Sequence, residues 1–181
     1  EDLLILSRNQ TRREEFRPVS VTDIIWDIIQ GIEVQAANKG LRLEYRLPRH
    51  LPLVMGDQDQ LHRLFLNIVN NALTYTASGS IAITAGSRNK YVEVIVRDTG
   101  IGIPAEALGR IFERFYRVDK ARSRQAGGTG LGLSIAKQIA EAHGGTINIF
   151  SREGQGTEVT IPLPVADRKK VPPETKVKRE G

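Results

Sequence analysis

The chain has 181 residues, 40% hydrophobic and 26% charged, which is ordinary for one globular domain with a short extension. It has no cysteine and three scattered histidines, which excludes disulfides and thiolate metal sites and makes a histidine-rich metal site unexpected. The net charge of +5 gathers in a basic tail, residues 166–181, which can bind nucleic acid or acidic lipid but which we expect to be a solvated, disordered end. Charge elsewhere is near balance, so no nucleic-acid partner is expected.

The first stretch, residues 1–16, has leucines followed by a charged run. We expect it to be the last turns of a helix that packs on another part of the protein. The chain opens on Glu1 rather than Met, which indicates a fragment of something larger. Pro18 ends this helix. No apolar run in the sequence approaches the length of a membrane span, and no signal peptide is visible.

The next elements are a helix and two strands. Ser20 and Asp23 form a capping pattern that starts the helix, and Gly40 ends it. Residues 41–47 alternate apolar and polar positions, which predicts a strand with one buried face. Residues 53–55 are expected to form a short edge strand.

A second long helix is predicted to begin at Asp57, because apolar residues then recur every three and four positions. Asn67 and Asn71 lie four positions apart on it and therefore project from one side. Helix interiors disfavour asparagine, so the pair needs a reason. Alone, the two amides fit solvated or self-bonded side chains as well as they fit oxygen ligands for Mg²⁺.

Two further strands are predicted over residues 80–85 and 91–97, joined by a hairpin-like turn. Asp98 follows the second strand and precedes a tight turn that contains Gly100 and Gly102. An ionised carboxylate only accepts hydrogen bonds, so Asp98 can take one from an exocyclic amine such as that of adenine. The glycines would let the backbone approach a flat ring. Taken alone, this stretch also fits a plain turn.

A glycine-rich turn, residues 127–132, leads directly into another predicted helix. Such a turn presents backbone N–H groups and a positive dipole end, which suits phosphate, although the P-loop and dinucleotide patterns are absent. Before it, residues 104–108 are expected to form a short helix. Phe112 and Phe115, three positions apart, are expected to pack on one face, and residues 119–128 are polar and aperiodic, which predicts a mobile loop.

The last predicted elements complete the fold. His143 closes the third long helix near the negative end of its dipole, and we take it as a structural residue. Residues 146–151 and 157–163 alternate in polarity and predict a hairpin, which ends the fold at Pro164.

Four of these stretches, taken in order, resemble the ATP-binding catalytic domain of bacterial sensor histidine kinases. This family belongs to a wider fold shared with gyrase, the ninety-kilodalton heat-shock chaperone and mismatch-repair ATPases. Each stretch alone is a weak signal, but four in order at these spacings are highly specific. They are an asparagine box at Asn67–Ala72, a first glycine box at Asp98–Gly102, a phenylalanine box at Phe112–Phe115 and a second glycine box at Gly128–Leu133.

The resemblance implies an α+β fold, a two-layer α/β sandwich in which a mixed, mostly antiparallel sheet is covered on one face by three helices. It implies that residues 1–17 are the remnant of a helical dimerisation and phosphoacceptor domain with its linker. Residues 18–165 would then be the ATP-binding catalytic domain, followed by the basic tail, residues 166–181. The domain is expected to be cytoplasmic, and its parent can be anchored in the inner membrane.

The same resemblance implies roles for individual residues. Asn71 would ligate Mg²⁺, Asn67 would lie beside the phosphates, and Asp98 would bind the adenine amine. Arg117 and Arg122 are candidates to reach the γ-phosphate, so these two arginines and the two asparagines form the implied catalytic set. The residues implied to surround ATP and Mg²⁺ are Asn67, Asn71, Tyr75, Asp98, Gly100, Gly102, Ile103, Gly128, Thr129, Gly130, Leu131 and Gly132.

Two departures from the family pattern matter. The family commonly has a lysine or arginine three positions after the second asparagine, but this chain has Thr74 there. One cationic phosphate contact is therefore missing, or it comes from Arg117, Arg122 or Arg124. The family's phosphoacceptor histidine is followed by an acidic residue and soon by an arginine and a proline, and none of the three histidines has this setting.

Three hypotheses follow. In the first, the domain binds Mg·ATP and phosphorylates a histidine on its own helical domain, within a homodimer, for relay to the aspartate of a response-regulator receiver domain. In the second, it is an ATP-hydrolysing clamp, whose relatives use a glutamate where this chain has Asn67, an amide that cannot accept a proton. In the third, it is a degenerate binding module without catalysis, which only Thr74 favours.

Overall fold

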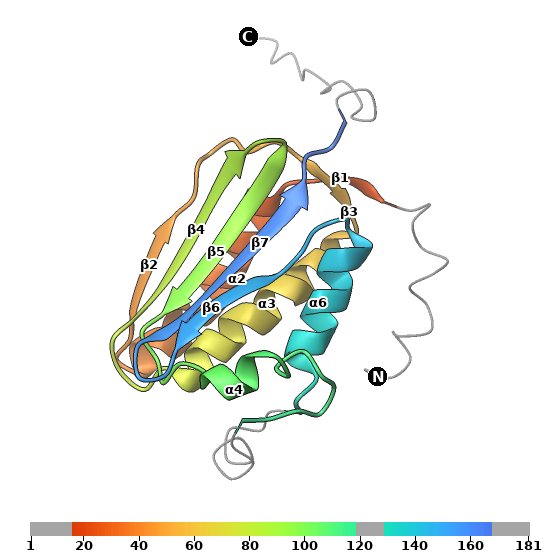
Figure 1. Ribbon diagram of the computed structural model, residues 1–181. Coiled ribbons are helices and arrows are strands. Elements are labelled where there is room, and N and C mark those ends of the chain that lie inside the picture. Colours follow the sequence, from red (N-terminus) through yellow and green to blue (C-terminus); the bar gives the residue numbers. More distant parts are fainter. Residues whose placement is uncertain (1–15, 119–128, 168–181) are drawn as a thin grey trace.

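A computed structural model describes residues 16–118 and 129–167 of the chain (Figure 1). The elements are β1 (Arg17–Val19), α2 (Val21–Asn38), β2 (Arg42–Arg46), β3 (Val54–Gly56), α3 (Gln58–Tyr75), β4 (Ser80–Arg88), β5 (Tyr91–Asp98), α4 (Ala105–Leu108), α6 (Gly132–Ala142), β6 (Asn148–Arg152) and β7 (Gly156–Pro164). Five strands form one sheet in the order β2-β4-β5-β7-β6, and β1 pairs separately with β3. The long helices α2, α3 and α6 all lie along one face of the large sheet (Figure 1).

The large sheet is mixed. Strand β2 pairs in parallel with β4, and the other three neighbouring pairs are antiparallel. Strand β4 continues to Arg88, beyond the predicted 80–85, and turns into β5 through Asn89 and Lys90. Both turn residues have positive φ, 49° and 67°, as in the tight two-residue turns that match the twist of a hairpin. The predicted sandwich with a mixed, mostly antiparallel sheet and three helices on one face is confirmed.

The core lies between the helices and the sheet. Helix α3 packs against both α2 and α6 and contacts the central strand β5. Alternate residues of the strands, such as Ile83, Val94 and Ile161, are fully buried beneath the helices. Burial of side chains of this size stabilises the fold by about 1.5–3 kcal/mol each. The helical stripes that the sequence predicted are buried, and they include Ile24, Ile25, Ile28, Ile32, Leu61, Leu64, Phe65, Ile68, Ile135, Ala136 and Ile139.

The predicted helix ends are confirmed at three points. The Ser20 hydroxyl caps α2 by accepting a hydrogen bond from the backbone N–H of Asp23 at 3.3 Å. Gly40 follows the last turn of α2 with a φ of 67°, the left-handed conformation that commonly closes a helix. Asp57 caps α3, because its Oδ1 accepts from the N–H of Gln60 at 3.1 Å.

Pro18 was expected to end a helix, but it lies inside strand β1. Pro18 lies opposite Met55 in the antiparallel pair β1–β3. A proline without an N–H group is tolerated there, because a two-stranded sheet leaves one edge of each strand unpaired. Strand β3 begins at Val54, one residue later than predicted, and Val54 also bridges to Val165.

His143 joins the C-terminal end of α6 to the N-terminal end of α3. Its Nδ1 donates to the carbonyl of Ile139 at 2.7 Å, and its Nε2 accepts from the N–H of Asp57 at 3.1 Å, which requires the neutral ring. Burial lowers the pKa of His143, although the bond to Ile139 opposes the shift. The ring of Phe16 stacks on the imidazole at 4.5 Å. The prediction of a structural histidine is confirmed.

Several expectations fall on residues outside the described part of the chain. These are nearly all of the helix expected over 1–16, the mobile loop expected over 119–128 and nearly all of the basic tail. Within residues 16–118 and 129–167, no helix combines the length and the hydropathy that crossing a membrane requires.

Candidate functional site

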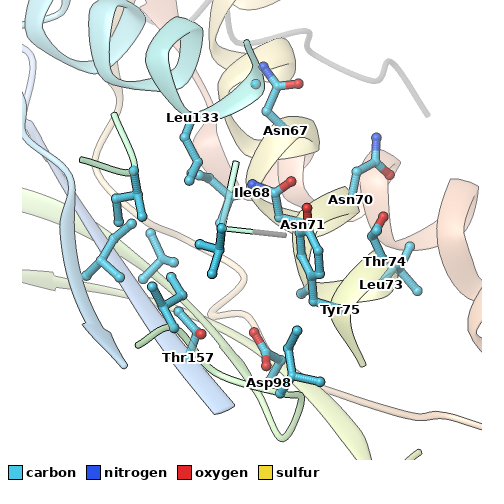
Figure 2. Close-up of a pocket in the computed structure, with 18 of the residues that line it drawn as sticks. Asn67, Ile68, Asn70, Asn71, Leu73, Thr74, Tyr75, Asp98, Leu133 and Thr157 are labelled. Atoms are coloured by element: carbon cyan, nitrogen blue, oxygen red, sulfur yellow. The ribbon is translucent and has the colours of Figure 1, made fainter. Parts of the chain in front are cut away.

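A cavity of about 790 Å³ opens where α3, the turn after β5 and the start of α6 meet (Figure 2). Figure 2 shows Asp98 and Thr157 at one end of the cavity and Asn67 at the other, with Asn71 and Tyr75 between them. Mostly apolar walls with a few convergent polar groups are typical of small-molecule sites. The apolar wall is formed by Ile68, Val96, Ile101, Ile103, Ile111, Leu133, Ile149 and Val159.

Asp98 is the last residue of β5 and is half-buried. Burial raises the pKa of its carboxyl above the ordinary 3.8, because it removes the water that would stabilise the charge. The backbone N–H groups of Gly100, at 2.8 Å, and of Thr157 donate hydrogen bonds to the carboxylate and oppose this shift. The carboxylate is thus oriented at the end of the cavity, where it can accept a hydrogen bond from an N–H donor of a ligand.

Gly100 and Gly102 have no room for a side chain, but the atoms that exclude one are protein backbone. A Cβ at Gly100 would stand 2.3 Å from the carbonyl oxygen of Tyr75. A Cβ at Gly102, whose φ is 68°, would stand 2.1 Å from the carbonyl oxygen of Arg152. These glycines therefore let the turn after β5 pack between the end of α3 and the β6–β7 turn. Gly102 lines the cavity, whereas Gly100 is buried outside its wall.

Sequence reasoning missed Thr157 and Ser151. Thr157 pairs with Asp98 in the β5–β7 register, and its hydroxyl lies 2.8 Å from that of Ser151. The Ser151 hydroxyl also accepts from the N–H of Ile103 at 2.8 Å. These bonds fasten the β6–β7 hairpin to the turn that follows Asp98. The alternation over 157–163 marks a strand, but only strand pairing places Thr157 beside the carboxylate.

Asn67 and Asn71 lie one turn apart on α3 and both line the cavity, as their spacing predicts (Figure 2). Gly132, the first residue of α6, lies beside Asn67 and also lines the cavity. Among the described residues, the Nδ2 atom of Asn67 is one of three buried side-chain polar atoms without a hydrogen-bond partner. A buried donor left without a partner costs about 1–3 kcal/mol, so this amide calls for an acceptor on a ligand.

Arg117 reaches the same cavity and carries a second such donor. Its Nη2 atom is buried and has no hydrogen-bond partner within the part of the chain that the structure describes. Gly130, with a φ of 72°, packs against it: a Cβ there would stand 3.3 Å from Cγ of Arg117. Two unpartnered donors, one amide and one guanidinium, therefore line one cavity. A ligand with several anionic oxygens matches them.

The prediction that Phe112 and Phe115 pack on one face is wrong. Phe115 has a φ of 64° and is 64% exposed, whereas Phe112 is half-buried with the ammonium of Lys137 5.2 Å from its ring centre. A spacing of three brings side chains together only on a helix, and residues 109–115 form successive turns. The N–H of Phe115 instead donates to the carbonyl of Gly130 at 2.9 Å.

The remaining predicted residues divide into three groups. Leu131 occupies the N-cap position of α6 without a capping bond from its side chain and is not part of the cavity wall. Arg122 and Gly128 lie outside the described residues, as does Arg124. The others line the cavity, and they are Tyr75, Ile103, Thr129 and Gly130. Thr74 lines the cavity too. So do Lys39 and Glu153, two residues that the sequence analysis did not single out.

The site combines an apolar slot, an oriented carboxylate at one end, and amide, guanidinium and helix-start donors at the other. This arrangement fits an adenine nucleotide, as the pocket of an ATPase domain would. Residues 56–167 match the family model described as histidine kinase-, DNA gyrase B-, and HSP90-like ATPase.

Curated relatives agree with this match. The sensor-like histidine kinase SenX3 of Mycobacterium tuberculosis is 41% identical over 166 residues, which cover 90% of this chain and 40% of SenX3. The sensor histidine kinase WalK of Bacillus subtilis is 39% identical over 170 residues, which cover 90% of this chain and 27% of WalK. The chain thus spans 40% or less of the length of these two relatives.

Solved structures give the same result. Full-length ShkA in complex with AMPPNP aligns with a TM-score of 0.77 and 28% identity, over 91% of this chain and 35% of ShkA. The catalytic domain of the histidine kinase ThkA aligns with a TM-score of 0.72 and 27% identity, over 83% of this chain and 96% of that domain. The chain belongs to the histidine kinase-, DNA gyrase B- and HSP90-like ATPase family, and within it to the ATP-binding catalytic domains of sensor histidine kinases.

Proposed function

We propose that this domain binds Mg·ATP and transfers the γ-phosphate to a histidine on an upstream helical domain, which passes it to an aspartate of a response-regulator receiver domain. One observation carries the proposal. Two buried donors without partners, Asn67 Nδ2 and Arg117 Nη2, line the same cavity as the oriented carboxylate of Asp98. Adenine offers an amine to a carboxylate, and a triphosphate offers many acceptors to buried donors.

The base would occupy the end of the cavity near Asp98. There the apolar wall, which includes Ile103 and Val159, offers a flat ring a place out of water. The Asp98 carboxylate is costly in the free protein because it is half-buried, and an N–H donor of the base would offset part of that cost. The adenine end therefore supplies specificity for the base.

The phosphates would occupy the other end, beside Asn67, Arg117 and the start of α6 at Gly132. Backbone N–H groups at a helix start favour anionic oxygens. The amide oxygen of Asn71 fits Mg²⁺, which takes oxygen ligands from few protein groups and from phosphates. When bound there, the ion would neutralise charge on the phosphates.

Phosphoryl transfer needs mainly positioning and charge neutralisation, and a neutral imidazole is already a nucleophile. In this proposal Asp98 anchors the base while Asn67 and Arg117 hold the phosphates, so that the γ-phosphate is presented to the acceptor. An amide at position 67 cannot act as a general base toward water. The proposal therefore predicts slow hydrolysis and favours the kinase over the hydrolytic clamp.

The proposal extends to the rest of the parent protein. Residues 1–17 are assigned to the end of the dimerisation and phosphoacceptor domain with its linker, residues 18–165 to the ATP-binding domain and residues 166–181 to a basic tail. The partners would be the acceptor helices of the same protein, within a homodimer, and a receiver domain. The domain would act in the cytoplasm, which supplies ATP, with its parent anchored in the inner membrane.

Two measurements test the proposal. Calorimetric titration should detect Mg·ATP binding that Asp98→Asn abolishes and that Asp59→Asn, an exposed position on the first turn of α3, leaves unchanged. Incubation with radiolabelled ATP and candidate helical acceptor domains should place an acid-labile, base-stable label on the acceptor. Fast phosphate release without an acceptor would support the hydrolytic clamp instead, and binding without transfer to any acceptor would support the degenerate module.

A further inference from the structure

Lys39, at the end of α2, lines the same cavity as Asn67 and Asn71 of α3. It is the residue that caps the C-terminal end of α2, and its backbone N–H is bonded to the last carbonyls of that helix. Its ammonium donates a hydrogen bond to the carbonyl of Leu73, near the end of α3. Lys39 and Thr74 both line the cavity. Figure 2 shows Leu73 and Thr74 on the side of α3 turned away from Leu133.

The cavity wall carries charges of both signs. Within the described part of the chain, four charged residues line it. The two acidic ones are Asp98 and Glu153, and Glu153 lies beside Gly102 in the turn that follows Asp98. The two cationic ones are Arg117, which carries an unpartnered donor, and Lys39. The acidic pair lies at the base end, Arg117 lies beside Gly130, and Lys39 reaches the cavity near Thr74.

We propose that Lys39 is a phosphate-binding residue, which supplies from α2 a positive charge that α3 lacks at Thr74. This inference rests on the proposed function, since it takes a nucleoside triphosphate as the ligand. The ammonium has three N–H donors and only one is needed for the Leu73 carbonyl. Lys39 is exposed, so its side chain can move toward a ligand, while the hydrogen bonds of its backbone N–H hold its backbone at the end of α2.

The competing role is a purely structural cap of α3. The last carbonyls of a helix lack partners within it, and a lysine near them is favourable. Two of these carbonyls already have partners, because the N–H of Thr76 donates to Ala72 and the N–H of Ile101 donates to Tyr75. Loss of a cap would lower the stability of the domain and lower its affinity for all ligands alike. Loss of a phosphate contact would lower the affinity more for ligands that carry more phosphate groups.

The test compares Lys39→Met with Lys90→Met, which removes the same charge from the turn between β4 and β5, outside the cavity wall. Calorimetry would measure the affinities of adenosine, Mg·ADP and Mg·ATP for the full chain. We expect Lys39→Met to lower the affinity for Mg·ATP about tenfold, that for Mg·ADP by a smaller factor and that for adenosine less than twofold. The affinities of Lys90→Met should be close to those of the unmodified chain. The difference should shrink as salt is raised.

A second variant separates the two roles of Lys39. Lys39→Met combined with Thr74→Lys restores a cation on α3 at the cavity wall, and we expect it to recover most of the affinity for Mg·ATP. Equal weakening of adenosine and Mg·ATP by Lys39→Met, with no recovery in the double variant, would overturn the inference. So would an unchanged affinity for Mg·ATP. If Asp98→Asn leaves binding of all three ligands intact, it is the proposed function that fails.

Discussion

Gly132 at the start of α6 lies against Asn67 in the middle of α3: a Cβ on Gly132 would stand 3.7 Å from the amide oxygen of Asn67. Two segments far apart in the sequence therefore form one wall of the cavity. The helix start presents backbone N–H groups where the buried amide of Asn67 also lacks a partner. An anion placed between them would satisfy both, so in the proposed function this contact marks the phosphate end of the site.

Asp98→Asn should separate nucleotide binding from folding. The amide keeps an oxygen for the N–H groups of Gly100 and Thr157 but loses the charge to which we assign the adenine amine. We expect at least a hundredfold loss of affinity for Mg·ATP, about 3 kcal/mol. The melting temperature at neutral pH should not fall, because burial disfavours the ionised carboxyl. Calorimetry and thermal unfolding of the same samples check this, and a variant that binds normally would contradict the role given to Asp98.

Nucleotide binding should weaken in mild acid earlier than an ordinary aspartate would allow. In the proposed function binding needs the ionised Asp98, and burial raises the pKa of this carboxyl above 3.8 in the free protein. The stability of the fold depends on pH in the opposite direction. Because the folded pKa is raised, ionisation of Asp98 destabilises the fold above that pKa, and protonation removes the penalty as the pH falls. Affinity measured against pH, with the carboxyl followed by carbon NMR, tests both. A transition in binding at or below pH 3.8 would contradict the prediction.

Gly102→Ala should destabilise the domain. The new Cβ would stand 2.1 Å from the carbonyl oxygen of Arg152, and the φ of 68° is unfavourable for a residue with a side chain. We expect a loss of about 2–4 kcal/mol in the free energy of unfolding. Gly31→Ala is the matched control, since Gly31 lies inside α2 with no atom within 4 Å of its Cβ position. There alanine should stabilise the helix by about 0.5–1 kcal/mol, as denaturant titration would measure. Equal effects at the two positions would refute this packing argument.

The stability of the domain should fall as the pH drops from 6.5 toward the lower pKa of the buried His143. Burial lowers this pKa from 6.5, so the unfolded chain binds the proton more readily, and stability is full above pH 6.5 and declines as the pH drops. His143→Phe should cost about 1–3 kcal/mol, because the N–H of Asp57 loses its acceptor, and should flatten the decline. Melting temperatures across this pH range test it, with His50→Phe at an exposed position as the control. A decline that persists unchanged in His143→Phe would assign it to another group.

Much of the fold follows from local patterns. The capping positions Ser20 and Asp57, the helical stripes and the alternation that leads to Asp98 all act within a few residues, and each is confirmed. One prediction is wrong because a helical spacing rule was applied to residues that are not in a helix. Phe112 and Phe115 were expected to share a face on spacing alone, but the backbone reverses at Phe115.

The sequence by itself determined the helices, the strands and the spacing of the asparagines and glycines, because these depend on side-chain periodicity and on the conformations that single residues allow. Only the tertiary structure decided that Thr157 lies beside Asp98, that Gly132 meets Asn67 and that Lys39 reaches the end of α3. Such contacts join residues far apart in the chain. They depend on strand register and on how the helices pack over the sheet, and no local pattern specifies either.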